Sequence, residues 1–130
     1  MMKIFLLIFL TISGLSIAQN TGQETSQNDY LLAENYYREG AYQKATQVFK
    51  KLYDSNLFNT AYLGRLVSCY QETNQFLLAE KLLKDRIKAN KNEVYLYVYL
   101  GYNYEKQQQE EKAQEYYKIA LISLKKNPAY

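Results

Sequence analysis

One internal repeat constrains this chain more than any other feature of its sequence. Between about residue 26 and residue 127 the same kinds of residue return every 34 positions, in three successive frames. A fixed period of this length is typical of arrays in which each repeat is a pair of helices stacked on the next pair. The sequence therefore predicts an all-α solenoid. The clearest recurring positions are Leu32, Leu66 and Leu100; Tyr36, Tyr70 and Tyr104; Ala45, Ala79 and Ala113; and Phe49, Leu83 and Tyr117.

Spacing inside each frame predicts two amphipathic helices. Leu32 and Tyr36 stand four residues apart, and Ala45 and Phe49 repeat that spacing after a break, so each pair shares one helical face. We expect repeats at about 26–59, 60–93 and 94–127, with helices at about 29–39 and 42–55 in the first repeat.

The break inside each repeat is a predicted turn with a residue at positive φ. Gly40 and then Asn74 occupy this position, and these are the two residue types that adopt left-handed backbone most readily. Gln108 occupies it in the third repeat. We therefore expect the third turn to be the least well specified.

These residues resemble the tetratricopeptide repeat (TPR) family, and the resemblance covers about 28–127. It implies a right-handed solenoid of three helix-turn-helix repeats, with six antiparallel helices. The small residue at Ala79 and the ring at Tyr70 match the family positions where the two helices of a repeat cross closely. Arg86 departs from the family pattern, because it stands at a normally small position and must find a partner or extend to solvent.

Residues 1–18 have the pattern of a secretory signal peptide. Lys3 precedes an apolar run over residues 4–12, and Ser16 and Ala18 place small residues before a cleavage site. The run is too short for a membrane-spanning helix, although an uncleaved anchor is the alternative. We expect an exported protein of the periplasm, cell envelope or extracellular space, with no membrane insertion after cleavage. Residues 19–27 are polar and predict a flexible leader.

Residues 128–130 resemble the start of a fourth, truncated repeat. A solenoid needs a polar surface on its terminal helices, because an end repeat otherwise exposes one apolar face to water. Two expectations follow. The chain is a fragment of a longer array, or its last repeat associates with a partner or with a second copy of the chain.

Composition removes most other classes of function. The sequence has no histidine and no glycine-rich phosphate loop, so it offers no imidazole base and no nucleotide cradle. A formal net charge of +3 is too small to predict a nucleic-acid surface. Cys69 is the only cysteine and is expected to be a small buried residue. We expect no enzyme activity, no cofactor and no metal.

The resemblance places the binding site in a concave groove lined by the first helix of each repeat. Tyrosine and arginine suit such a surface, because tyrosine gives contact area with few rotatable bonds and arginine can grip a carboxylate or stack on a ring. We expect a module that binds another protein or peptide; the alternative is a purely structural segment at the start of a longer solenoid. The candidate groove residues are Tyr30, Tyr37, Arg38, Arg65, Tyr95, Tyr99 and Tyr102.

Overall fold

A computed structural model describes residues 21–126 of the chain. The predicted signal peptide at 1–18 and the predicted start of a fourth repeat at 128–130 lie outside the described residues. A first helix over residues 21–38 is followed by five more, and the described part contains no strand. The all-α solenoid is confirmed. The later helices are α2 (Tyr42–Ser55), α3 (Thr60–Glu72), α4 (Phe76–Ala89), α5 (Val94–Lys106) and α6 (Glu110–Lys126).

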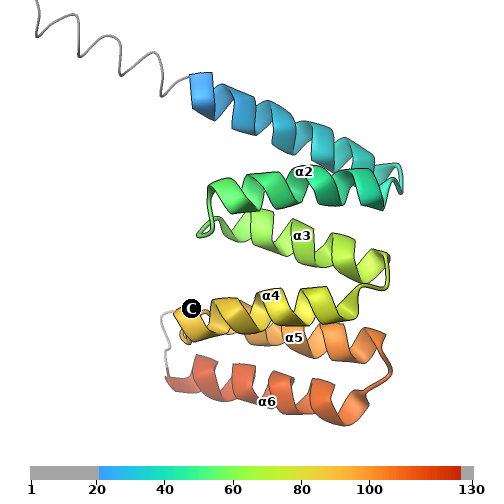
Figure 1. Ribbon diagram of the computed structural model, residues 1–130. Coiled ribbons are helices and arrows are strands. Elements are labelled where there is room, and N and C mark those ends of the chain that lie inside the picture. Colours follow the sequence, from blue (N-terminus) through green and yellow to red (C-terminus); the bar gives the residue numbers. More distant parts are fainter. Residues whose placement is uncertain (1–20, 127–130) are drawn as a thin grey trace, which may run out of the picture.

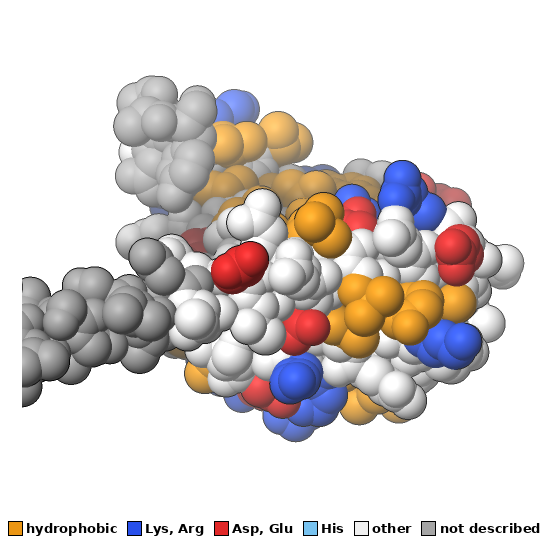
Figure 2. Space-filling model, turned by 90° about the horizontal axis from the view of Figure 1, so that it is seen from above, with side chains coloured by type: hydrophobic (Ala, Val, Ile, Leu, Met, Phe, Trp, Pro, Cys, Tyr) orange, Lys and Arg blue, Asp and Glu red, His pale blue; other side chains and the backbone are white. Residues whose placement is uncertain are grey.

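The helices stack in chain order, from the first helix at one end to α6 at the other (Figure 1). From α2 onward each helix packs against the next one in the sequence. Such an arrangement has no central core; each helix instead buries its apolar stripe against its neighbours. Figure 2 views the molecule from the end of the stack that the first helix occupies.

The residues that recur in the sequence form the continuous core. Ala45, Ala79 and Ala113 are buried where a large side chain would force the two helices of a repeat apart. Tyr70 and Tyr104 are also buried, and the ring of Tyr104 stacks on that of Tyr116 with centroids 5.4 Å apart. Cys69 is buried as predicted, and burial raises the pKa of its thiol to about 11.

The three turns inside the repeats share one hydrogen-bonded form. Gly40, Asn74 and Gln108 have φ values of 74°, 57° and 59°. The residue after each donates its backbone N–H to the carbonyl of the tyrosine five positions earlier, at 2.8, 2.7 and 3.0 Å. A left-handed residue with this long backward bond is the Schellman end of a helix. Gln108 therefore adopts the same turn as Gly40, although its side chain disfavours that backbone.

Replacing Gln108 by glycine is expected to raise the free energy of unfolding by about 0.5–1 kcal/mol, because glycine adopts positive φ without steric cost. Gln107→Gly is the matched control, since Gln107 has a φ of −89° and gains nothing from glycine. Thermal unfolding measures both. An unchanged or lower melting temperature for Gln108→Gly would contradict the idea that the third turn is strained.

The first helix begins earlier than the sequence predicted. Residues 21–27, expected to belong to a flexible leader, are helical and continuous with residues 28–38. Extending an existing helix needs no new nucleus, and the segment contains glutamine and glutamate, which are good helix formers. Thr25 and Ser26 add hydroxyl hydrogen bonds of 2.8 and 3.0 Å to the carbonyls of Thr21 and Gly22. The leader was predicted from the lack of apolar residues in this segment, which does not prevent it from extending the helix that follows.

Two other departures from the repeat pattern concern the length of α6 and the partner of Arg86. The second helix of the third repeat, α6, has 17 residues, against 14 in α2 and α4. Arg86 is buried and forms two hydrogen bonds with the carboxylate of Glu93, at 2.9 and 2.7 Å. Among the residues described, no helix is long and apolar enough to cross a membrane.

Candidate protein-interaction groove

The first helix, α3 and α5 together line a hollow of about 210 Å³. These are the first helices of the three repeats, which the resemblance placed along the concave side. The hollow brings together three of the predicted groove residues, Tyr30, Arg65 and Tyr99, from three different helices. Its remaining lining residues are Thr60, Ala61, Gly64 and Ser68, all on α3.

Small residues on α3 give the hollow its depth. Ala61, Gly64 and Ser68 follow one another at spacings of three and four, so they share a face of the helix. The Ser68 hydroxyl donates to the Gly64 carbonyl at 2.9 Å and thus stays close to its own helix. A Cβ atom at position 64 would lie 3.1 Å from the Tyr99 hydroxyl oxygen. Glycine therefore lets the Tyr99 ring lie close over the α3 backbone.

Arg65 is the charged group of this surface, and it is already partnered. Its Nε lies 2.5 Å from a carboxylate oxygen of Glu34 on the first helix. Its guanidinium also lies over the Tyr37 ring, 5.2 Å from the centroid. Burial lowers the pKa of Arg65, but its hydrogen bond with Tyr30 and the charge of Glu34 outweigh burial and raise the pKa overall. The hollow is thus close to electrically neutral.

The other predicted groove residues are distributed around the hollow. Tyr37 is half-buried, and its ring meets that of Tyr42 edge-on with centroids 5.2 Å apart. Arg38 is exposed and hydrogen-bonds the side chain of Asn35 within its own helix. Tyr102 is exposed beside Lys106, whose ammonium lies 5.7 Å from the ring centroid. None of these three contributes to the hollow itself.

Tyr95 has a supporting position. It is half-buried against the core, and its hydroxyl donates to a Glu93 carboxylate oxygen at 2.8 Å. Burial and this bond raise its pKa to about 12. Its ring meets Tyr99 edge-on, with centroids 5.7 Å apart, so it holds Tyr99 in place.

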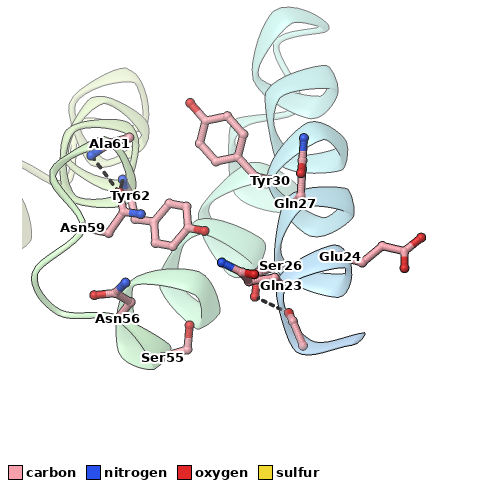
Figure 3. Close-up of a pocket in the computed structure, with 11 residues that line it drawn as sticks. Gln23, Glu24, Ser26, Gln27, Tyr30, Ser55, Asn56, Asn59, Ala61 and Tyr62 are labelled. Atoms are coloured by element: carbon pink, nitrogen blue, oxygen red, sulfur yellow. Dashed lines mark hydrogen bonds between the residues drawn. The ribbon is translucent and has the colours of Figure 1, made fainter. Parts of the chain in front are cut away.

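A second, larger hollow of about 1000 Å³ opens between the first helix and the α2–α3 corner (Figure 3). Sequence reasoning missed it, because one wall comes from residues 22–27, which were predicted to be a leader. Tyr30 and Tyr62 both border it, with ring centroids 5.8 Å apart. Helix-forming glutamine and glutamate in this segment were the available signal. Its polar lining consists of Gln23, Glu24, Ser26, Gln27, Ser55, Asn56 and Asn59.

Within residues 21–126 no group of three or more histidine, cysteine, aspartate or glutamate side chains is placed to hold a metal ion. The arrangement offers aromatic faces, hydroxyls and a paired guanidinium around a hollow. These groups suit binding by contact and hydrogen bonding.

The sequence matches no protein family profile and no curated protein sequence. Solved structures do resemble the fold. SycD, a type III secretion translocator chaperone of Yersinia enterocolitica, is 20% identical with a TM-score of 0.71, over 82% of this chain and 80% of SycD. PcrH, solved in complex with the chaperone binding region of PopB, is 19% identical with a TM-score of 0.66, over 82% and 86%. MamA is 19% identical with a TM-score of 0.65, over 81% of this chain and 61% of MamA.

At these identities the likeness concerns the fold. The chain shares the TPR-like, all-helical repeat architecture of SycD, PcrH and MamA. The class defined by the fold is therefore a TPR-like α-solenoid.

Proposed function

We propose that this chain is a protein-interaction module that binds a segment of another protein in the groove between the first helix, α3 and α5. The observation that carries the proposal is the hollow over Gly64, bordered by Tyr30 on one side and Tyr99 on the other. Its volume of about 210 Å³ is enough for one large side chain. It is therefore suited to anchor one residue of a bound segment.

The chemistry of the groove favours apolar and hydrogen-bonding contacts over charge. Arg65 is neutralised by Glu34, and Lys106 by Glu72 at 2.9 Å, so neither cation is free for an acidic partner. Exposed tyrosines supply rigid contact area and hydroxyls. PcrH provides a precedent in this fold, since it was solved with a region of its partner bound. Binding of a partner segment, without catalysis, is the activity that these features support.

We place this activity outside the cytoplasm, in the cell envelope or beyond. Support comes from the signal-like sequence of residues 1–18, with Lys3 before an apolar run. N-terminal sequencing of the protein recovered from its native compartment tests both export and cleavage. A first residue of Gln19 is expected, and recovery of the intact N-terminus in the cytoplasm would contradict the assignment.

Tyr99→Ala is expected to weaken binding by about tenfold or more while leaving the melting temperature nearly unchanged, because this ring borders the hollow and is partly exposed. The probe is a set of peptides selected on the wild-type protein from a random displayed library. Fluorescence anisotropy gives their dissociation constants.

Tyr97→Ala is the matched control on the same helix. Residues 97 and 99 lie about 200° apart around α5, so Tyr97 points away from the hollow. Its hydroxyl donates to the Lys91 carbonyl at 3.2 Å. We expect Tyr97→Ala to bind the peptides as wild type does. Equal weakening in both variants, or a large fall in melting temperature for Tyr99→Ala, would contradict the proposed groove.

A further inference from the structure

The outer surface of the first helix exposes a position that the other repeats bury. Leu32, Leu66 and Leu100 occupy the same place in successive repeats, and their exposed fractions are 43%, 2% and 0%. Leu66 on α3 and Leu100 on α5 belong to helices that pack against a preceding helix, α2 or α4. Leu32 occupies the equivalent position on the first helix, but no described helix packs over it as α2 and α4 pack over Leu66 and Leu100. We call the surface formed by Asp29, Leu32 and Tyr36 the first-helix face.

The outer surface of α6, at the other end of the stack, also exposes a position that the equivalent helices bury. Tyr53, Ile87 and Leu121 share a repeat position; Tyr53 is 8% exposed, Ile87 is half-buried and Leu121 is 58% exposed. Tyr53 and Ile87 belong to α2 and α4, which are covered by α3 and α5. Leu121 and Leu124, three residues apart, form an exposed apolar stripe along α6. We call this stripe the α6 face.

Each face is one half of a contact that the chain makes twice internally. The α2–α3 and α4–α5 contacts join the second helix of one repeat to the first helix of the next. The α6 face carries Leu121 where α2 and α4 carry Tyr53 and Ile87. On the first-helix face, Leu32 and Tyr36 stand where α3 and α5 also carry leucine and tyrosine. Asp29 is a difference, because α3 carries Leu63 at that position. At Leu32, Tyr36 and Leu121 the two faces therefore carry the kinds of residue that meet in the internal contacts.

The charges at the two faces are complementary as well. Glu24 and Asp29 lie in the first half of the first helix, whereas Lys125 and Lys126 lie in the last turn of α6. Consecutive helices in the array run antiparallel, so an internal-type contact would set the start of one helix beside the end of the other. The acidic start of the first helix would then lie beside the basic end of α6. Figure 2 shows apolar side chains on the first-helix side of the molecule, with charged ones next to them.

We propose that the first-helix face of one copy binds the α6 face of a second copy, extending the solenoid head to tail. A dimer through two α6 faces would leave both first-helix faces exposed, whereas the head-to-tail contact covers one face of each kind. Because the contact joins two different faces, it repeats along an open chain of copies unless it closes into a ring. The surface is separate from the concave groove and does not depend on peptide binding there.

Single substitutions on the two faces test the contact. Analytical ultracentrifugation of the purified protein, over a wide concentration range, is expected to show reversible growth beyond the dimer. Leu32→Asp on one face and Leu121→Asp on the other are each expected to weaken association by about 30-fold or more, because each places a charge against apolar side chains. Circular dichroism and melting temperature confirm that both variants fold.

Mixing the two variants distinguishes a head-to-tail contact from a like-with-like one. Leu32→Asp keeps an intact α6 face and Leu121→Asp keeps an intact first-helix face, so an equimolar mixture should form a 1:1 heterodimer that grows no further. Leu77→Asp, on an exposed residue of α4, is the control and should associate as wild type does. A monomer at all concentrations would overturn the proposal. So would a mixture that fails to form heterodimers, or a Leu32→Asp variant that dimerises normally.

Discussion

Replacing Arg86 by methionine is expected to lower the free energy of unfolding by about 3–5 kcal/mol, the usual cost of leaving one partner of a buried ion pair alone. Arg86 is buried, and its partner Glu93 is largely so, with 16% of its side chain exposed. Methionine fills a similar volume without charge. The loss therefore comes from the carboxylate that is left without its cation.

Arg86 connects three segments that the repeat pattern alone does not join. It binds Glu93, which immediately precedes α5, and it donates from a third nitrogen to the Leu57 carbonyl at 3.0 Å. Its guanidinium also lies 5.0 Å from the centroid of the Phe58 ring. One side chain at the end of α4 thus fixes the α2–α3 connection and the start of α5. Removing it should loosen both junctions between repeats.

Acid should weaken this cluster. Burial alone would raise the pKa of Glu93, but hydrogen bonds from Arg86, Tyr95 and Asn90 outweigh burial and lower the pKa below its usual value. A carboxyl whose pKa is lower in the folded state contributes its full stability above the unfolded value of about 4.3 and loses it as pH falls through the folded value. The difference between wild type and Arg86→Met should therefore shrink below about pH 4.

Urea unfolding at pH 7 and at pH 3 measures both effects. Lys81→Met is the control, because it breaks a Lys81–Asp85 pair of 2.6 Å that is exposed to solvent and should contribute little to stability. The double variant Arg86→Met with Glu93→Met removes both charges and should recover most of the loss. If Arg86→Met were no less stable than Lys81→Met, the Arg86–Glu93 pair would contribute little to the free energy of unfolding.

The repeat period predicted the fold because it reports packing, and packing decides where helices lie. Ala45, Ala79 and Ala113 recur because each helix crossing needs a small residue, and the structure buries all three. Arg86 was recognisable as a buried residue in need of a partner because it interrupts that pattern. Its partner Glu93 could not be predicted. Glu93 lies in the loop between α4 and α5, and the path of that loop does not follow from the repeat pattern.

The candidate groove was only partly predictable for the same reason. Of the residues expected along the groove, Tyr30, Arg65 and Tyr99 line one hollow. Tyr95, at the same kind of position, is instead held by Glu93, and nothing in the repeat pattern shows this. The second hollow depends on residues 22–27, where helix formation follows from continuity with a buried helix rather than from local hydrophobicity.

Replacing Gly101 by valine is expected to cost near the upper end of about 1–3 kcal/mol, the usual range for overpacking a core. A Cβ atom at position 101 would lie 2.5 Å from the Tyr117 ring, closer than two carbon atoms can approach. In an open helix the same substitution would gain stability, because glycine is among the worst helix formers. A lower free energy of unfolding for Gly101→Val would therefore indicate a clash with Tyr117.

The three repeats give the reason for this pair. Ala33 and Phe49, Val67 and Leu83, and Gly101 and Tyr117 stand at the same two repeat positions, and the largest partner accompanies the smallest residue. The double variant Gly101→Val with Tyr117→Leu recreates the pair of the second repeat. It should recover much of the loss, although Tyr117→Leu also removes a 2.6 Å hydrogen bond to Glu105. Tyr117→Phe measures that bond separately.

A double-mutant cycle from chemical unfolding gives the coupling between the two positions. A strong favourable coupling would show that the repeat conserves the summed volume of this pair rather than either residue. If the losses of the single variants simply added, the small residue at position 101 would have another cause. The cycle thus tests directly why the repeats vary at one position while the helices keep their spacing.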